Sequence, residues 1–191
     1  MGRRRTEEKW NAITHAFGLG MCFAFFISGS FNTRVISFFL MLTYSFSTLY
    51  HATQRGKIKD FFRMLDMTSI HVTIAGTSVS YILVMGGGIR ECIPSIILGV
   101  ACTQYVICQY GKEILEKTSV LIYVLAGAFC FGNVLFLSNE SLSLSLTYFV
   151  SGCVVYLVGL VYYIFDSNPY YHTIWHIFVL GASCIHVFGT M

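Results

Sequence analysis

The chain has 191 residues, of which 55% are hydrophobic and only 11% are charged, and its mean hydropathy is +0.68. Soluble domains usually carry about 25% charged residues, so the polar side chains here are too few to cover a water-facing surface. The net charge of +3 and the pI near 8.5 come without a basic face on a soluble fold, which argues against nucleic-acid binding. We therefore expect the apolar surface to face lipid.

Seven apolar stretches are each long enough to cross the hydrocarbon core of a bilayer as a helix, which takes about 20 residues. We expect these spans at residues 11–30, 34–53, 66–86, 93–110, 118–137, 143–165 and 171–189. The sequence thus predicts an all-α fold, a polytopic seven-transmembrane-helix bundle forming a single domain over residues 1–191. We expect the first stretch to be retained as a span and not cleaved as a signal peptide, because it is long and contains polar residues.

The basic residues predict how the bundle is oriented, because lysine and arginine concentrate in cytoplasmic loops. Two of the twelve lie on one side of the predicted spans, Arg34 and Arg90. The other ten lie on the opposite side: Arg3, Arg4, Arg5, Lys9, Arg55, Lys57, Lys59, Arg63, Lys112 and Lys117. We therefore expect a cytoplasmic N-terminus and an external C-terminus in a multi-pass protein of the cell (inner or plasma) membrane.

Ionisable side chains within the spans follow the same polarity. In chain order, those near the predicted cytoplasmic ends are His15, His51, Asp66, His172 and His176. Burying a charged group in a bilayer costs about 2.5–3.5 kcal/mol on insertion scales, so such residues usually mark a functional site. Five polar residues from four spans share one depth, although the orientation that aligns them comes from lysine and arginine alone.

The histidines predict a metal site. His172 and His176 are four residues apart, which places both imidazoles on one helix face. Adding His51 gives three nitrogen ligands, as in catalytic zinc sites that keep a fourth position for water. Asp66 then either accepts the proton of that water or is itself the fourth ligand of a closed structural site. Ser47, one turn before His51, is a candidate for a substrate-facing or supporting hydroxyl.

Other polar residues in the spans have simpler explanations. His71 and His186 are expected to hydrogen-bond to neighbouring helices, because neither lies on the face or at the depth of the predicted metal site. Glu8, Asn11 and His15 form one stripe of the first helix. This stripe either lines the same end of the site or reflects the ordinary polarity of a helix end.

In order along the chain, these motifs resemble the haemolysin III branch of the progestin and adipoQ receptor family. The resemblance runs from about residue 7 to residue 189, and it is carried by Glu8, Asn11, His15, Gly18, Ser47, His51, Arg63, Asp66, His172, His176 and His186. It implies a seven-helix fold with a cytoplasmic N-terminus. It also implies a zinc ion held by His51, His172 and His176, with Asp66 contacting the water that the zinc activates. Ser69 departs from the family, which commonly has glycine at this position.

The resemblance also frames the functional hypotheses. Eukaryotic relatives are regarded as receptors with ceramidase-like hydrolase activity, and bacterial members are named for haemolysis and linked to membrane-lipid and membrane-energy homeostasis. We first expect a zinc-dependent hydrolase of lipid amides or esters, with Asp66 and Ser47 as catalytic candidates. The alternatives are a non-catalytic sensor or regulator with a structural zinc ion, and a cytolytic protein, which seven spans make poorly suited to secretion.

The expected partners are membrane lipids. Neither nucleic acid nor a soluble protein partner is indicated by the sequence, and self-association is left open.

Overall fold

The computed structural model describes residues 2–138 and 144–191, and in these parts of the chain it contains seven α-helices and no strand. Their bounds are α1 Gly2–Ser28, α2 Phe31–Ala52, α3 Lys57–Val84, α4 Ile89–Gln109, α5 Glu113–Leu137, α6 Leu144–Ile164 and α7 Tyr171–Phe188. Each contains a segment long and apolar enough to cross a membrane. The predicted all-α, seven-span fold is confirmed, while most of the predicted connector at 138–141 lies outside the described residues.

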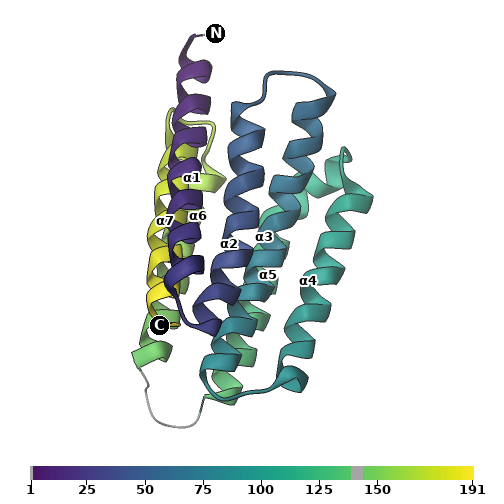
Figure 1. Cartoon of the computed structure of the whole chain (residues 1–191). Helices are drawn as coiled ribbons and strands as arrows, with labels where there is room; N and C mark the ends of the chain where they lie inside the picture. Colours follow the sequence, from purple (N-terminus) through teal and green to yellow (C-terminus); the bar gives the residue numbers. More distant parts are fainter. Residues whose placement is uncertain (1, 139–143) are drawn as a thin grey trace.

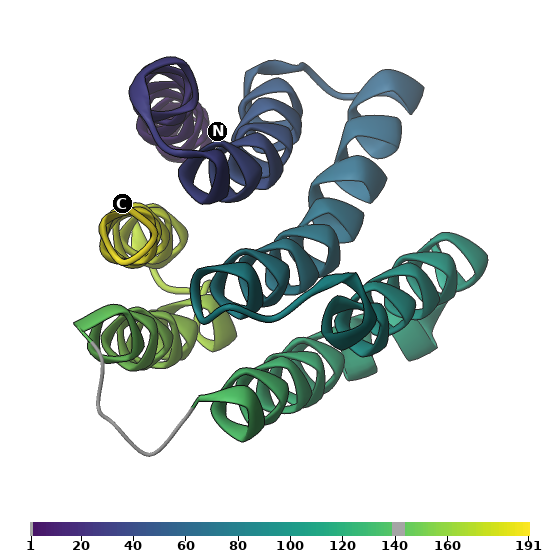
Figure 2. The ribbon, with the colours of Figure 1, turned by 60° about the horizontal axis from the view of Figure 1, so that its bottom comes forward.

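The helices run side by side, and the two ends of the chain lie at opposite ends of the bundle (Figure 1). The longest helix, α3, is central and packs against α2, α4, α5 and α6 (Figure 2). Helix α1 packs against both α2 and α7, so the first and last spans are neighbours. Helix α1 thereby brings the start of the chain into contact with its last helix.

Five helices begin earlier than their predicted spans, and three of them do so by five residues or more. Helices α1, α3 and α5 start at Gly2, Lys57 and Glu113, whereas the apolar stretches suggested residues 11, 66 and 118. Hydropathy detects only the part of a helix that lies in lipid. Backbone hydrogen bonding continues beyond that part, where charged side chains face water.

The early start of α3 shortens the turn between α2 and α3 to residues 53–56. Gly56 allows this tight turn because its φ of 128° lies in a region that side-chain-bearing residues rarely adopt. Lys59 consequently sits on the first turn of α3, beside the end of α2. Its ammonium group donates to the carbonyls of Tyr50 at 3.1 Å and Thr53 at 3.3 Å.

At the opposite end, hydroxyl groups join the α1–α2 turn to the end of α7. Ser30 caps α2, and its Oγ lies 2.9 Å from Thr33 Oγ1. Both hydroxyls donate to the Thr190 carbonyl, at 3.1 Å and 2.9 Å respectively. Gly189 allows close packing here, because a Cβ at that position would lie 2.1 Å from the Tyr81 hydroxyl. The hydroxyl groups of this turn therefore serve to hold the helices together.

The two remaining histidines do not bond as expected. Both ring nitrogens of His71 are buried without a hydrogen-bond partner, and the ring instead packs 4.8 Å from that of Tyr123. His186 Nδ1 is also without a partner, and its ring lies among Tyr81, Phe149 and Tyr156. The predicted interhelical hydrogen bonding is therefore wrong for His71 and for this nitrogen of His186. Aromatic packing takes its place.

Candidate metal centre

Three histidines from two helices meet at the end of the bundle where α2 finishes and α7 begins. His51 lies in the last turn of α2, and His172 and His176 occupy the first two turns of α7. One ring nitrogen from each lies within 4.8 Å of the other two, a spacing at which they can hold a metal ion. His51 and His176 are buried, at 6% and 2% exposed, and His172 is half-buried. This is the trio that the sequence singled out.

The outer ring nitrogen, Nδ1, of each histidine faces an oxygen atom of the protein. His51 Nδ1 lies 2.8 Å from Glu8 Oε2, and His176 Nδ1 lies 3.2 Å from the carbonyl oxygen of Asn11. His172 Nδ1 lies 3.7 Å from Asp166 Oδ2. A proton on Nδ1 leaves the lone pair of a neutral imidazole on Nε2, which is the arrangement of a metal-binding histidine.

One ring nitrogen of the trio makes no hydrogen bond within the described part of the chain. His51 Nε2 is buried and has no hydrogen-bond partner. A buried nitrogen in this state loses its hydration without compensation, so it calls for an explanation. A metal ion would satisfy it. Three clustered imidazoles, two of them with a hydrogen-bonded Nδ1, therefore fit a transition-metal ion, and imidazole suits zinc among others.

Asp66 lies on α3 beside this cluster but is not a member of it. Its carboxyl group lies near the Ser47 hydroxyl and within electrostatic range of His172. No Asp66 oxygen joins the three nitrogens in the group within 4.8 Å. Ser47 is buried one turn before His51, and its hydroxyl makes no hydrogen bond. Of the two roles considered for Asp66, this placement favours a neighbour of the coordination site over a fourth ligand.

The sequence matches the family described as haemolysin-III related over residues 3–187. The chain belongs to the haemolysin-III-related family. Hemolysin-3 of Bacillus cereus is 28% identical over 197 aligned positions, which cover 95% of this chain and 89% of that relative. The hemolysin-3 homolog of Bacillus subtilis (strain 168) is 29% identical, covering 95% and 92% respectively. No solved structure is significantly similar to the chain.

Family membership and seven apolar helices together make this haemolysin-III-related chain a multi-pass membrane protein. The family resemblance inferred from the motifs is confirmed.

The polar stripe of α1 in this haemolysin-III-related chain lies against the cluster along its length. Glu8 and Asn11 contact the outer nitrogens of His51 and His176, as described above. His15 stacks on His176 with ring centroids 3.6 Å apart and planes 11° apart. Thr173 adds a hydrogen bond to the Asn11 side chain, at 2.5 Å. The stripe therefore lines the site and does more than give polarity to a helix end.

Two contributors were not singled out from the sequence. Asp166 was read only as part of a connector, although it is the acidic residue that precedes the histidine pair. Lys59 was counted only as a cytoplasmic charge, yet its Nζ lies 3.2 Å from Glu8 Oε1. An acidic residue six positions before His172 carried a usable signal. The role of Lys59 depends on the early start of α3, which hydropathy does not reveal.

Proposed function

We propose that this chain holds a zinc ion through His51, His172 and His176 and hydrolyses amide or ester bonds of membrane lipids. The observation that carries the proposal is a trio of histidines, two with a hydrogen-bonded Nδ1, next to a carboxyl group outside the trio. When bound, zinc supplies a Lewis acid for the carbonyl and lowers the pKa of water to about 7.

The protein's own groups would then handle protons and orientation. A carboxylate oxygen of Asp66 accepts a proton from the attacking water and returns it to the leaving amine or alcohol. Ser47, whose hydroxyl lies near the Asp66 carboxyl, would orient the water or the lipid carbonyl. Asn11 and Glu8 would accept hydrogen bonds from the Nδ1 atoms of their histidines and so orient the rings.

The proposed location is the cytoplasmic side of the cell membrane. His51 precedes the α2–α3 turn, and that turn lies at the same end of the bundle as the N-terminus (Figure 1). The segments rich in lysine and arginine are at this end, and such segments stay in the cytoplasm. A lipid in the inner leaflet would therefore present its carbonyl at about the depth of the histidines.

The test is lipid turnover by purified, zinc-loaded protein in mild detergent, with ceramides and ester lipids as substrates. Asp66→Ala should lower turnover by about 10²–10⁴-fold, the usual contribution of a general base, while leaving bound zinc in place. Asp60→Ala is a matched control, because Asp60 is an exposed carboxylate two turns earlier on α3. Absence of turnover in the wild type, or full activity in Asp66→Ala, would refute the hydrolase.

A second candidate function is a regulator in which the metal ion is structural. It is favoured by the origin of the ligands on α2 and α7, which otherwise make little direct contact with each other. A metal ion would tie these helices together and convert binding energy into fold stability. Stripping the metal should then lower the melting temperature, with no lipid pool changing in cells that carry the metal-free variant. A change in a lipid pool favours the enzyme.

The names of the Bacillus relatives suggest a third activity, lysis of cells. Seven apolar spans argue against an attack on foreign membranes. To reach another cell, the chain would have to leave its bilayer and expose these spans to water. Active protein in a cell-free supernatant would raise this function above the other two.

A further inference from the structure

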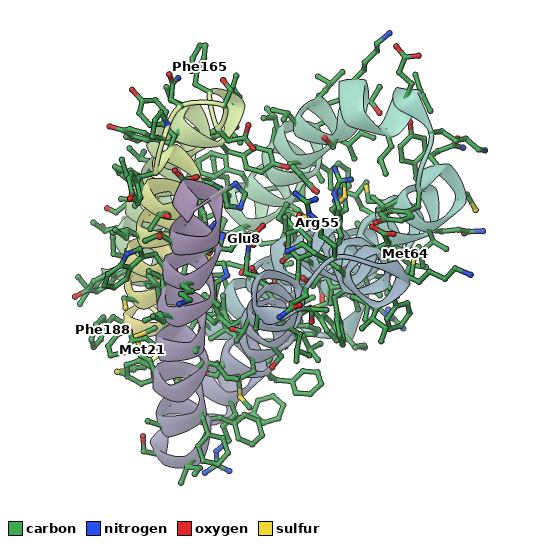
Figure 3. All side chains as sticks on the ribbon, turned by 90° about the horizontal axis from the view of Figure 1, so that it is seen from above. Glu8, Met21, Arg55, Met64, Phe165 and Phe188 are labelled. Carbon is green, nitrogen blue, oxygen red and sulfur yellow. The ribbon has the colours of Figure 1, made fainter. Side chains whose placement is uncertain are left out.

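Glu8 contacts two different helices, through a hydrogen bond to His51 and an ion pair with Lys59. Its Oε2 lies 2.8 Å from His51 Nδ1 on α2, and its Oε1 lies 3.2 Å from Lys59 Nζ on α3. Seen down the bundle, Glu8 lies on the side of α1 that faces the other helices (Figure 3). Its side chain is 38% exposed, whereas that of His51 is 4% exposed. One carboxylate thus spans the boundary between water and the buried histidine.

Lys59 is itself fixed to the end of α2. Besides Glu8, its ammonium group bonds to the Tyr50 and Thr53 carbonyls and lies 4.5 Å from the centre of the Tyr50 ring. Carbonyls in the last turn of a helix have no partner within the helix, so a cation there is stabilising. Glu8 therefore contacts His51 on one side and, on the other, a lysine that is bonded to the same end of α2.

The contact with Glu8 decides which nitrogen of His51 is available. A carboxylate accepts a hydrogen bond and cannot donate one, so Nδ1 must carry the proton and Nε2 the lone pair. Nε2 is the nitrogen of His51 left buried without a hydrogen-bond partner, and His51 belongs to the histidine trio. With the opposite tautomer, the proton would sit on Nε2 and metal binding there would be blocked.

The three outer contacts differ in how they can be altered. His176 Nδ1 lies 3.2 Å from the Asn11 backbone carbonyl and 3.3 Å from the Thr14 hydroxyl, and the Asp166–His172 distance of 3.7 Å is too long for a hydrogen bond. The Glu8–His51 contact, at 2.8 Å, is the shortest of these and is made by a side chain. It is consequently the contact that a single substitution alters most.

We propose that Glu8 is a positioning residue of the metal centre, fixing the tautomer and orientation of His51, with Lys59 holding the carboxylate in place. The inference rests on the metal-binding part of the proposed function and does not require hydrolysis. It makes α1 part of the metal site although α1 supplies no ligand. Metal affinity accordingly depends on how firmly the first helix is docked on the α2–α3 turn.

The first test measures zinc affinity of the purified full-length protein by competition with a chromogenic chelator. Glu8→Ala should weaken binding by roughly 10–100-fold, the usual effect of losing a partner of a metal-bound histidine. Glu8→Gln should lose less, because its amide oxygen still accepts the Nδ1 hydrogen. Lys59→Met should also lose less than Glu8→Ala. Glu113→Ala is the matched control, since it removes a carboxylate from an exposed ion pair with Lys117.

The outcomes separate the two proposals. If the folded Glu8→Ala protein binds zinc as tightly as the wild type, the positioning role is wrong while the metal site stands. If the wild type itself binds no zinc, the proposed function fails and the positioning role fails with it.

A second measurement covers the case in which Glu8→Ala does not fold. Nitrogen-15 NMR of the metal-free wild type and of Glu8→Gln reports which ring nitrogen of His51 carries the proton. We expect the Nδ1–H tautomer in both proteins. The Nε2–H tautomer in the wild type would overturn the inference without any destabilised variant.

Discussion

At the end of the bundle where α7 finishes, the hydroxyls of Ser30 and Thr33 both donate to the Thr190 carbonyl and lie 2.9 Å from each other. At the other end, His51 has one nitrogen bonded to Glu8 and the second buried without a partner. Both ends bring buried polar groups together from distant parts of the chain. The outer end completes its hydrogen bonds internally, whereas the histidine end leaves a lone pair uncompensated.

This difference separates polarity that serves packing from polarity that serves a ligand. Interhelical hydrogen bonds in membrane proteins contribute modestly, on average about 0.6 kcal/mol each. A buried group without any bond loses its hydration and gains nothing in return. Three clustered imidazoles, one of them with a nitrogen bonded to Glu8 and the other left unbonded, are therefore better explained by a binding partner than by stability.

The largest effect should come from removing two ligands together. His172→Ala/His176→Ala should reduce bound zinc from about one ion per chain to none, because a single imidazole cannot hold the ion against water. Elemental mass spectrometry of the purified protein measures this. His186→Ala is the control, since His186 lies on the same helix but outside the cluster. Zinc retained by the double variant would contradict the view that one end of the bundle serves a ligand and the other serves packing.

A smaller effect is expected from the ring that stacks on a ligand. His15→Ala removes the partner of His176, and stacked aromatic pairs contribute about 0.5–1.5 kcal/mol. Zinc affinity should therefore fall by up to about tenfold, measured with the same chelator competition. His15→Phe keeps a flat ring and should stay within about twofold of the wild type. Equal losses in both variants would show that stacking is not the reason.

The smallest effect should appear at the outer end. Thr33→Val removes a hydroxyl that bonds to the Thr190 carbonyl, and the free energy of unfolding should fall by about 0.6–1.7 kcal/mol. Zinc affinity should not change, because the hydroxyl lies at the far end of the bundle. Unfolding in mixed micelles measures the first quantity. Ser28→Ala is the control, since its hydroxyl bonds only within α1. A drop in zinc affinity would mean that the two ends are coupled.

The fold was largely predictable because lipid imposes a simple rule on composition. All seven spans follow from runs of apolar residues, and each one corresponds to a helix. The helix starts were not predictable in the same way. At Gly2, Lys57 and Glu113 the chain is already helical in segments rich in charge, where hydropathy has no information about backbone hydrogen bonding.

The site was predictable as far as depth and helical spacing reach. The i, i+4 pair and the shared depth place His51 with His172 and His176, and the structure brings these three together. The contacts of Glu8 and Asn11 needed the packing of α1 between α2 and α7, which no local pattern encodes. His71 shows the converse error. Its ring packs against Tyr123, and both ring nitrogens are left without a hydrogen bond. Here aromatic packing, and not hydrogen bonding, determines the position of the side chain.

The adjacency of α1 and α7 has a consequence for biosynthesis. The ribosome delivers Glu8 and His51 early, but His172 and His176 emerge only with the last span. Until that span inserts, α1 lacks one of its two packing partners, α7, and the cluster has a single ligand. Metal capture would then report that the whole chain has been threaded into the bilayer. A nascent chain stopped before residue 171 should therefore remain metal-free.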